Sequence, residues 1–277
     1  MITSASFSPG RVLSVAAFGL LAVTASAQTL VSHYTLDGVG TDSGSIAVNG
    51  TLAGSAVYGA SGSGVGRFDK ALSSPGAATD YFTAATGNKS ALGGSALTIV
   101  LWVNIDSITS GQIDRLVSNI TASTGFDLTV ANTTPASGVG SFALAFGFND
   151  TSTRATSNDA SYVLDKWLFL AVTYDGANIK FYSGDETTSL GLTDTAAKTG
   201  SISVSSSALE IGGTPVTPND RNPTALFNDV SIYNGALTLS QLEALRVSAI
   251  PEPSHYALIL SALSAGLLVV RGRRRRC

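Results

Sequence analysis

Short apolar segments of alternating pattern, separated by turn residues, constrain the fold of this chain most strongly. Leu97 to Ile105 has an apolar residue at every odd position, and Val100 and Trp102 occupy even positions. Because successive side chains of a β-strand point to opposite faces, this segment is expected to be a central strand buried on both faces. Phe142 to Phe148 alternates large with small side chains, which predicts a large face in a core and a small face against another backbone, a ligand or water. Turn residues recur about every 8–12 positions, so the chain is predicted to be all-β.

A tight hairpin is predicted in the second half of the chain. Residues 168–174 and 179–182 flank Asp175-Gly176-Ala177-Asn178, and Asp, Gly and Asn tolerate the positive φ angles of a hairpin turn. Leu209 to Ile211 is predicted to be a further short strand.

One short helix is predicted after the strands. Thr238 is followed three residues later by Gln241, which is the spacing of a capping box at a helix N-terminus. We expect this helix to face the sheets with Leu239, Leu242 and Leu245.

Residues 1–27 have the features of a secretory signal peptide. Arg11 precedes an apolar stretch over residues 12–23, and Ala25-Ser26-Ala27 supplies the small residues that a signal peptidase requires. The stretch is too short to be a convincing membrane span. We therefore expect Ala25 and Ala27 to define the cleavage site and Gln28 to be the first mature residue.

Residues 249–277 form a second address segment. Pro251-Glu252-Pro253 is followed by an apolar run over residues 256–270 and then by five arginines. A helix through this run has about 15 residues at about 1.5 Å each, a little short of a bilayer core, and flanking arginine side chains extend its reach. Positive charge holds that end of a membrane helix in the cytoplasm. The predicted membrane-stop residues are Arg271, Arg273, Arg274, Arg275 and Arg276.

This order of elements resembles the PEP-CTERM sorting signal of Gram-negative bacteria. The resemblance implies that a membrane protease of the exosortase type recognises Pro251-Glu252-Pro253 and removes the tail. It also implies a precursor anchored in the inner membrane and a mature protein at the cell surface or in an extracellular matrix. An ordinary C-terminal membrane anchor is the alternative interpretation.

The segment between these address signals, residues 28–248, has the size of one β-sandwich or two small domains and contains no linker or internal repeat. It carries ten basic and eighteen acidic side chains, a formal charge of −8, which argues against a nucleic-acid or anionic-membrane partner. Cys277, the only cysteine, lies in the tail, so the mature chain can form no disulfide. With His33 as its only histidine, a zinc site built on His and Cys is excluded.

Six segments of this region resemble, in order, those of laminin G-like (LamG) jelly rolls in the concanavalin A-like lectin and glucanase superfamily. They are Tyr34–Asp37 with Asp42-Ser43-Gly44, Gly66–Leu72, Leu97–Val103, Trp167–Gly176, Leu209–Gly213, and Asp229–Asn234 with Ala236-Leu237. The resemblance implies two antiparallel sheets packed face to face as a jelly-roll sandwich, with Trp102 and Trp167 in the core. The sequence departs from the family where Leu168 replaces a His, and where Asn228-Asp229 replaces a pair of Asp.

Several LamG-like domains hold a calcium ion between the opening and the closing strand. Carried over to this sequence, Asp37 and Asp229 supply carboxylates and Asn228 supplies an amide oxygen, which are ligand types that Ca²⁺ prefers. Asn228 in place of a carboxylate removes one charge, so weaker binding is expected. The alternative is that these residues cap turns and bond to the backbone. The expected cofactor is therefore a structural Ca²⁺ or none.

Recognised catalytic patterns are absent from the sequence. A retaining glycosidase needs two carboxyl groups about 5 Å apart, and glucanases of the superfamily place them in a Glu-x-Asp-x-x-Glu strand. None of the four Glu residues begins that pattern; they are Glu186, Glu210, Glu243 and Glu252. A pair of Asp from separate strands remains open. A Ser-His-Asp triad has to use His33, with Asp37 on the same strand face.

The sequence therefore predicts an exported, non-catalytic protein with one LamG-like sandwich that binds polysaccharide or another surface component. A purely structural matrix component is one alternative, and a glycan-active hydrolase with unusual residues is another. Exposed aromatic side chains on the concave face favour binding, a face of Ser, Thr and Ala favours the structural role, and two facing carboxylates favour hydrolysis.

Overall fold

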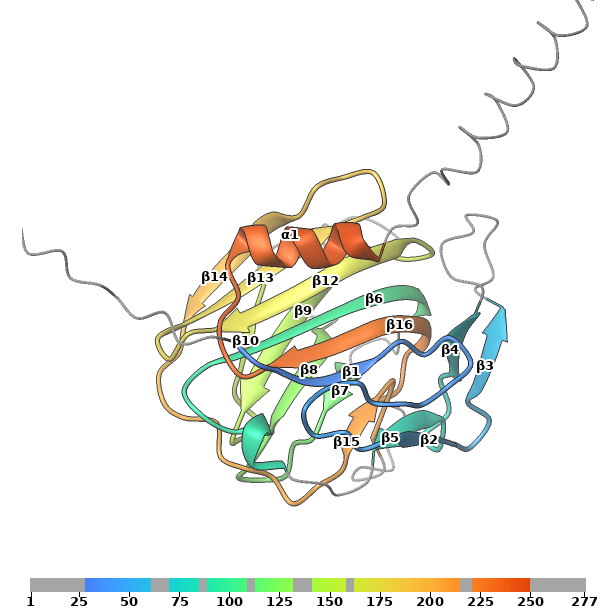
Figure 1. The fold of residues 1–277 in the computed structure, drawn as a ribbon, viewed down its shortest axis with the longest axis horizontal. Coiled ribbons are helices and arrows are strands. Elements are labelled where there is room, and N and C mark those ends of the chain that lie inside the picture. The colour runs from blue at the N-terminus through green and yellow to red at the C-terminus, as the bar shows by residue number, and fades with distance from the viewer. Residues whose placement is uncertain are drawn as a thin grey trace, which may run out of the picture.

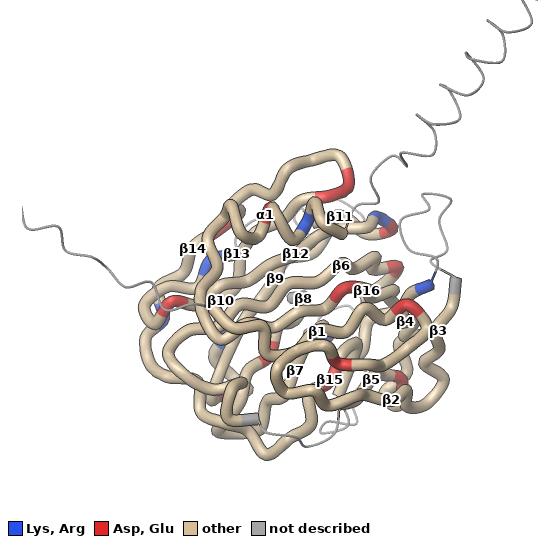
Figure 2. Tube along the Cα trace, in the orientation of Figure 1, with Lys and Arg blue, Asp and Glu red and all other residues tan. Residues whose placement is uncertain are grey.

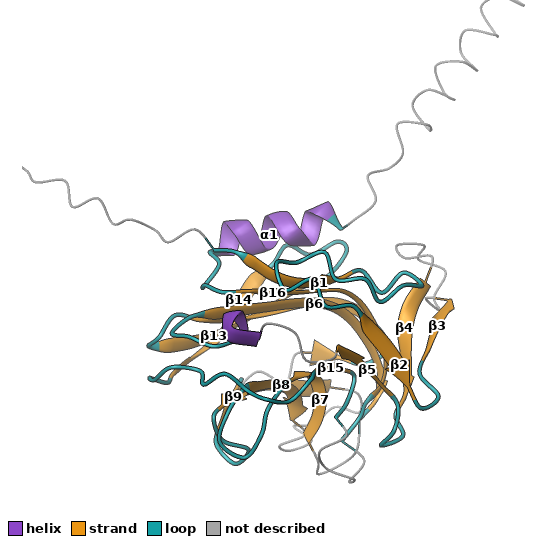
Figure 3. Cartoon of the chain, turned by 60° about the horizontal axis from the view of Figure 1, so that its bottom comes forward, coloured by secondary structure: helices purple, strands orange, loops and turns teal. Residues whose placement is uncertain are grey.

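The computed structural model shows an all-β sandwich of two antiparallel sheets with one helix on an outer face (Figures 1 and 3). The structure describes residues 28–60, 70–84, 89–108, 113–131, 141–157, 162–214 and 221–249. Residues 1–27 and 250–277, with the predicted cleavage, sorting and membrane-stop residues, lie outside the described residues. No helix within the described ranges is long and apolar enough to cross a membrane.

The described ranges contain strands, one short 3₁₀ helix and one α-helix. The strands are β1 (Leu30–Tyr34), β2 (Gly50–Ala53), β3 (Val57–Ala60), β4 (Lys70–Pro75), β5 (Tyr81–Ala84), β6 (Leu97–Ser107), β7 (Ile113–Ser118), β8 (Phe126–Ala131), β9 (Ser141–Phe148), β10 (Arg154–Thr156), β11 (Tyr162–Val163), β12 (Trp167–Tyr174), β13 (Asn178–Gly184), β14 (Gly191–Ala197), β15 (Leu209–Ile211) and β16 (Thr224–Tyr233). The helices are η1 (Lys89–Leu92) and α1 (Leu239–Ser248).

The sheet that carries α1, which we call the helix-side sheet, has the strand order β14-β13-β12-β6-β16-β4-β3. Strand β16 pairs with β6 along its length, with β4 through residues 224–227, and with β1 through residues 230–233. The last strand of the described ranges therefore lies in the middle of this sheet, beside the predicted central strand β6.

The other sheet, which we call the far sheet, has the strand order β10-β9-β8-β7-β15-β5-β2, with β11 paired to β9. The large side chains of β9 point between the two sheets, as predicted; they are Phe142, Leu144, Phe146 and Phe148. Its small residues, such as Ala145 and Gly147, lie on the outer face.

The main core fills the space between the two sheets. Strand β6 contributes Leu97, Ile99, Leu101, Val103 and Ile105, each no more than 1% exposed. Its intervening residues Val100 and Trp102 are also buried, but they belong to a second cluster beneath α1. This confirms the prediction of a central strand buried on both faces. Trp102 and Trp167 are core residues, as expected, in the second cluster rather than between the sheets.

The helix α1 begins with the predicted capping box. The Thr238 hydroxyl accepts a hydrogen bond from the Gln241 backbone N–H, and the Gln241 side chain accepts one from the Thr238 N–H. Leu242 is fully buried and Leu245 packs against the second cluster. The prediction for Leu239 is wrong, because its side chain is 44% exposed. Leu239 is the first residue of α1, at the end of the helix, whereas Leu242 and Leu245 lie further along it over the second cluster.

A polar anchor fixes α1 to the connection between β13 and β14. The guanidinium of Arg246, 5% exposed, donates to both carboxylate oxygens of Glu243 and to the backbone carbonyl of Asp185. Glu243 also accepts a hydrogen bond from the Leu190 N–H at 2.9 Å. These bonds fix the position of the helix on the sheet as well as its orientation.

Two turns take the conformations that the sequence predicts. In the β12–β13 hairpin, the Asp175 carboxylate accepts hydrogen bonds from the N–H groups of Ala177 and Asn178, and Gly176 has a φ of +93°. After β1, the carboxylate of Asp42 accepts hydrogen bonds from three backbone N–H groups, those of His33, Gly44 and Val48. This second turn holds the chain that follows β1 against the strand.

Candidate functional site

The structure brings two of the three predicted calcium ligands together. The Asn228 Nδ2 donates to Asp37 Oδ1 at 3.0 Å and to the Lys70 backbone carbonyl at 2.9 Å. Both partners only accept hydrogen bonds, so the network assigns the amide nitrogen to this position and turns the amide oxygen away. Asn228 is fully buried, and in this state it acts as a hydrogen-bond donor where a calcium site needs an oxygen.

Asp229, the third predicted ligand, has a different partner. It lies at a bulge of β16, between Asn228 and Ser231, with a φ of +46°. Its Oδ1 is 3.4 Å from Nε2 of His33. The three residues therefore do not converge on one point, and among the described residues no group of three or more His, Cys, Asp or Glu side chains could hold a metal ion. Calcium binding here stays a prediction, and it requires both Asn228 and Asp229 to reorient.

A cavity of about 370 Å³ lies between α1 and the helix-side sheet, and Asp229 and His33 line it. This volume is within the range of small-molecule sites, about 300–1,000 Å³. Strands β6 and β12 supply an apolar floor, in which the rings of Trp102 and Phe169 meet edge to face at 5.3 Å. The remaining walls come from β1, β16 and the C-terminal half of α1; they are Leu30, Val100, Ser231, Tyr233, Leu245, Ser248 and Ala249.

The bulge in β16 explains why a charged residue reaches this cavity. A β-bulge adds a residue to one strand and re-aims the side chains at that point. The pairing of β16 with β6 is regular up to Asn228 opposite Trp102 and resumes with Ser231 opposite Val100. Asp229 lies within the interruption, where its N–H donates to the Thr35 carbonyl instead of to β6. Figure 2 shows acidic positions in this part of the molecule, where β1, β4 and β16 meet.

Ser43, His33 and Asp229 form a line of polar contacts at the edge of the cavity. The Ser43 Oγ is 2.8 Å from His33 Nδ1, and the His33 and Asp229 side chains are 27% and 25% exposed. A carboxylate accepts and does not donate, so Nε2 of His33 is the donor to Asp229. Asp229, and not the sequence-predicted Asp37, is the carboxylate that faces His33.

This line has the residue types of a catalytic triad without its oxyanion donors. The N–H groups of Ser43, Ser45 and Ile46 donate to the carbonyls of β1, and the Gly44 N–H donates to Asp42. Acyl transfer depends on N–H groups that point at a developing oxyanion, and those beside Ser43 all have internal partners. The arrangement is suited to hydrogen bonding with a ligand.

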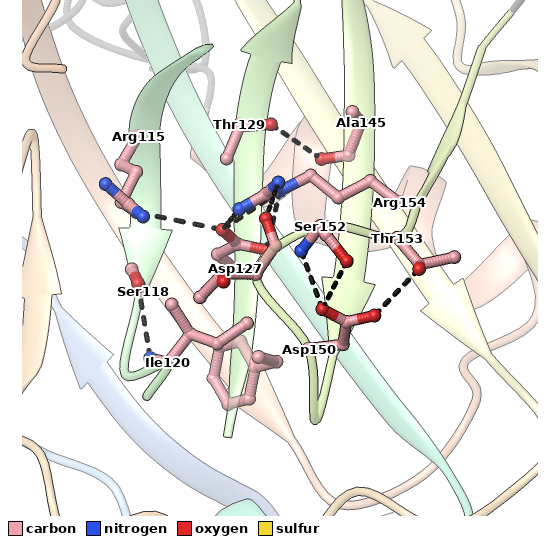
Figure 4. A network of polar contacts seen from close by, with 12 residues as sticks. Arg115, Ser118, Ile120, Asp127, Thr129, Ala145, Asp150, Ser152, Thr153 and Arg154 are labelled. Atoms are coloured by element: carbon pink, nitrogen blue, oxygen red, sulfur yellow. Dashed lines mark hydrogen bonds and ion pairs between the residues drawn. The ribbon is translucent and has the colours of Figure 1, made fainter. Parts of the chain in front are cut away.

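A second polar cluster crosses the outer face of the far sheet (Figure 4). Strand register places Glu210, Ser118, Asp127, Gly147 and Arg154 in one row over β15, β7, β8, β9 and β10. Glu210 is 3% exposed and Asp127 is fully buried, although the main core is on the opposite face of these strands.

Asp127 is the centre of this row. Arg154 Nε donates to both of its carboxylate oxygens at 3.1 and 3.0 Å, and Arg115 Nε lies 3.7 Å from Oδ2. Burial raises the pKa of the Asp127 carboxyl, and the hydrogen bonds and charge of Arg154 oppose that shift. Gly147 makes the approach possible, because a Cβ there would lie 2.8 Å from the Arg154 side chain.

Sequence reasoning missed this cluster, although a signal for it exists in β8. Asp127 and Thr129 alternate there with Phe126, Leu128 and Val130, which is the pattern of a strand with one apolar face and one polar face. That pattern predicts solvent exposure of Asp127. The ion pairs that accompany its burial come from Arg115 and Arg154, which are distant in sequence.

We expect Asp127→Ala to destabilise the protein by about 3–5 kcal/mol, because two arginine side chains remain buried without their carboxylate. Urea unfolding followed by fluorescence measures the change. Asp106→Ala, at an exposed position of β6, is the matched control and should change stability by less than about 0.5 kcal/mol. A similar small effect at Asp127 would show that the row contributes little to stability.

Comparison with known proteins identifies the fold. The family model described as the concanavalin A-like lectin/glucanases superfamily (Laminin_G_3) matches residues 75–243. Domain 4 of AbnA, a GH43 extracellular arabinanase from Geobacillus stearothermophilus, solved in complex with arabinotriose, is 19% identical, with a TM-score of 0.56 over 79% of this chain and 98% of that one. No curated protein sequence matches the chain.

Two toxin structures are similar as well. The binding domain of Paraclostridial Mosquitocidal Protein 1 is 15% identical, with a TM-score of 0.58 over 79% of this chain and 52% of that one. The binding domain of Botulinum Neurotoxin DC in complex with SialylT is 16% identical, with a TM-score of 0.57 over 80% and 51%. This chain thus spans about half the length of these toxin structures. Such identities show the fold alone, whereas the family model covers more than half of the chain, and the protein therefore belongs to the concanavalin A-like lectin/glucanase superfamily.

Proposed function

We propose that this protein is an exported, non-catalytic surface or matrix protein that binds polysaccharide in the cavity beneath α1. The observation that carries the proposal is the composition of that cavity. Its floor is aromatic, and its edge carries the carboxylate of Asp229, the imidazole of His33 and the hydroxyl groups of Ser231 and Ser248. Apolar pockets with a few convergent polar groups are the usual form of small-molecule sites.

Glycans match this composition because a sugar ring has an apolar C–H face and a rim of hydroxyl groups. The C–H face packs against aromatic rings, and the hydroxyls both donate and accept hydrogen bonds. Asp229 can accept from a hydroxyl, and the serines can do either. The similar fold of two solved structures supports the proposal. The AbnA domain was solved in complex with arabinotriose, and the Botulinum Neurotoxin DC binding domain in complex with SialylT.

The charged row of the far sheet supports a non-catalytic role. Its carboxylates Asp127 and Glu210 lie on strands separated by β7, and both side chains are almost completely buried. Asp127 also accepts hydrogen bonds from Arg154 through both oxygens. A glycosidase needs one carboxylate free to attack the sugar or to activate water, and a second to protonate the leaving group. The bonding of Asp127 makes this row better suited to stability than to glycan cleavage.

We expect Ser248→Trp to reduce glycan binding at least about tenfold, because an indole at the end of α1 blocks the cavity. The measurement is isothermal titration of the purified protein with those members of a polysaccharide panel that bind the wild type. Val247→Trp is the matched control, since Val247 is 50% exposed and does not line the cavity.

Equal binding by the wild type and both Trp variants would place the glycan site elsewhere on the sandwich. Absence of binding to every glycan of the panel would contradict the proposed function and favour a purely structural matrix component. Thermal unfolding of both variants confirms that the substitutions leave the fold intact.

We further propose that Asp37, Asn228 and Asp229 bind a structural Ca²⁺. Asn228→Asp replaces the donating amide with a carboxylate and should bind Ca²⁺ at least about tenfold more tightly than the wild type. Calorimetric titration and the rise in Tm on adding Ca²⁺ measure the effect. If neither the wild type nor the variant releases heat or gains in Tm, these residues serve the hydrogen-bond network alone.

The tail supports a proposal for sorting by an exosortase-type protease. Replacing Pro251, Glu252 and Pro253 by Ala should leave the full-length precursor in the membrane fraction of a bacterium that has such a protease. The wild-type protein should instead appear shortened, at the cell surface or in the medium. Immunoblotting of cell fractions distinguishes these forms, and equal processing of both proteins would favour an ordinary membrane anchor.

A further inference from the structure

We propose that the cavity beneath α1 selects glycans that carry a free ammonium group, as in an amino sugar, with Asp229 as the counter-ion. The inference rests on the proposed function, because it names the ligand class of the same site. It follows from the charge, the aromatic composition and the backbone geometry of the cavity.

In the Ca²⁺-free protein, Asp229 gives the cavity a negative charge. Asp229 and His33 are the acid and the base among the described residues that line it, and no Lys or Arg side chain lines it. The contact partners of the His33 ring are Ser43 Oγ at Nδ1 and Asp229 Oδ1 at Nε2, so one ring contact leaves the second carboxylate oxygen of Asp229 for a ligand. Tyr233 also lines the cavity, and burial raises the pKa of its hydroxyl, so it stays neutral.

The basic residue of the covering helix is occupied by other partners. Arg246, the only cation of α1, donates to Glu243 and to the carbonyl of Asp185. It is therefore turned towards the β13–β14 connection, and it is absent from the residues that line the cavity. A ligand cation can consequently approach Asp229 without competition from this guanidinium.

One partly exposed aromatic residue adds to the preference for a cation. Tyr233 lines the same cavity as Asp229 and is half-buried, whereas the rings of Trp102 and Phe169 beneath it are 0% and 2% exposed. The negative face of an aromatic ring attracts an ammonium group, most strongly where the pair is shielded from water. A carboxylate beside aromatic rings recognises a protonated amine better than a neutral hydroxyl, because hydrogen bonds to charged groups are the stronger ones.

Asp229 has a strained backbone conformation. Its φ of +46° lies in the left-handed region, and Leu36, next to the Thr35 carbonyl that the Asp229 N–H contacts, has a φ of +62°. Such conformations are unfavourable, persist where the surrounding structure imposes them, and concentrate at functional sites. The strained residue is part of the bulge that places the Asp229 carboxylate at the cavity. An acetylated sugar amine has no positive charge to pair with this carboxylate and is bulkier than an ammonium group.

The test compares binding of glucosamine oligomers with binding of N-acetylglucosamine oligomers of equal length, by isothermal titration in Ca²⁺-free buffer at a pH at which the sugar amines are protonated. We expect the wild type to bind the free amine at least about tenfold more tightly. Asp229→Asn keeps the shape of the side chain and should reduce that preference to within about twofold. Asp229→Glu restores the charge and should recover part of the preference.

Asp106→Asn is the matched control, since it removes the same charge at an exposed position of β6 and should keep the full preference. Equal affinity of the wild type for both oligomers, or an unchanged preference in Asp229→Asn, would overturn the inference. A third outcome would overturn the inference and leave the proposed function standing. In that outcome the wild type binds neither oligomer but binds other glycans, and Ser248→Trp abolishes that binding. Thermal unfolding of each variant shows that a lost preference does not come from a lost fold.

Discussion

The helix-side sheet has two apolar faces, and the rest of the structure depends on this property. Strands β6 and β12 bury one set of alternate side chains between the sheets and the other set, including Trp102 and Phe169, on the outer face. An outer face of this kind must be covered, because contiguous exposed apolar surface promotes association. The helix α1 supplies the cover, and its chain position directly after β16 places it there.

A short helix covers a broad apolar surface incompletely, and the cavity results from this difference in shape. Leu242 packs directly on the aromatic cluster, whereas the next turns of α1 leave space above Trp102 and Phe169. The Arg246 anchor to Glu243 and Asp185 fixes the helix at one side, so the helix cannot move across to fill that space. The same two elements therefore produce both the stability of the outer layer and the cavity.

Local features of the sequence predicted much of the fold. The correctly predicted features each involve residues that are close in sequence, so short-range geometry determines them. They are the period of two in β6 and β9, the Asp-Gly turn after Tyr174 and the capping box at Thr238. The family resemblance supplied the architecture of two antiparallel sheets packed face to face. The exposure of Leu239 was not predicted, because the leucine spacing alone does not show how far the end of the helix extends over the sheet.

The candidate site was less predictable, because it depends on contacts between distant segments. The sequence indicated Asp37, Asn228 and Asp229 correctly as neighbours of the opening and closing strands, but a bulge and the direction of one amide decide what each contacts. His33 and Asp229 are 196 positions apart. The row around Asp127 has the polar alternation of an exposed strand face, and arginines from two other strands accompany its burial.

The central place of β16 has a consequence for how the chain folds. Strands β6 and β4 both pair with β16, so the helix-side sheet stays divided until the last strand of the sandwich has been inserted. Pairing between residues so far apart closes long loops, which slows folding and makes it late. During synthesis from the N-terminus, the apolar edge of β6 therefore remains open until nearly the whole sandwich is available, and nascent chains depend on protection from aggregation for that interval.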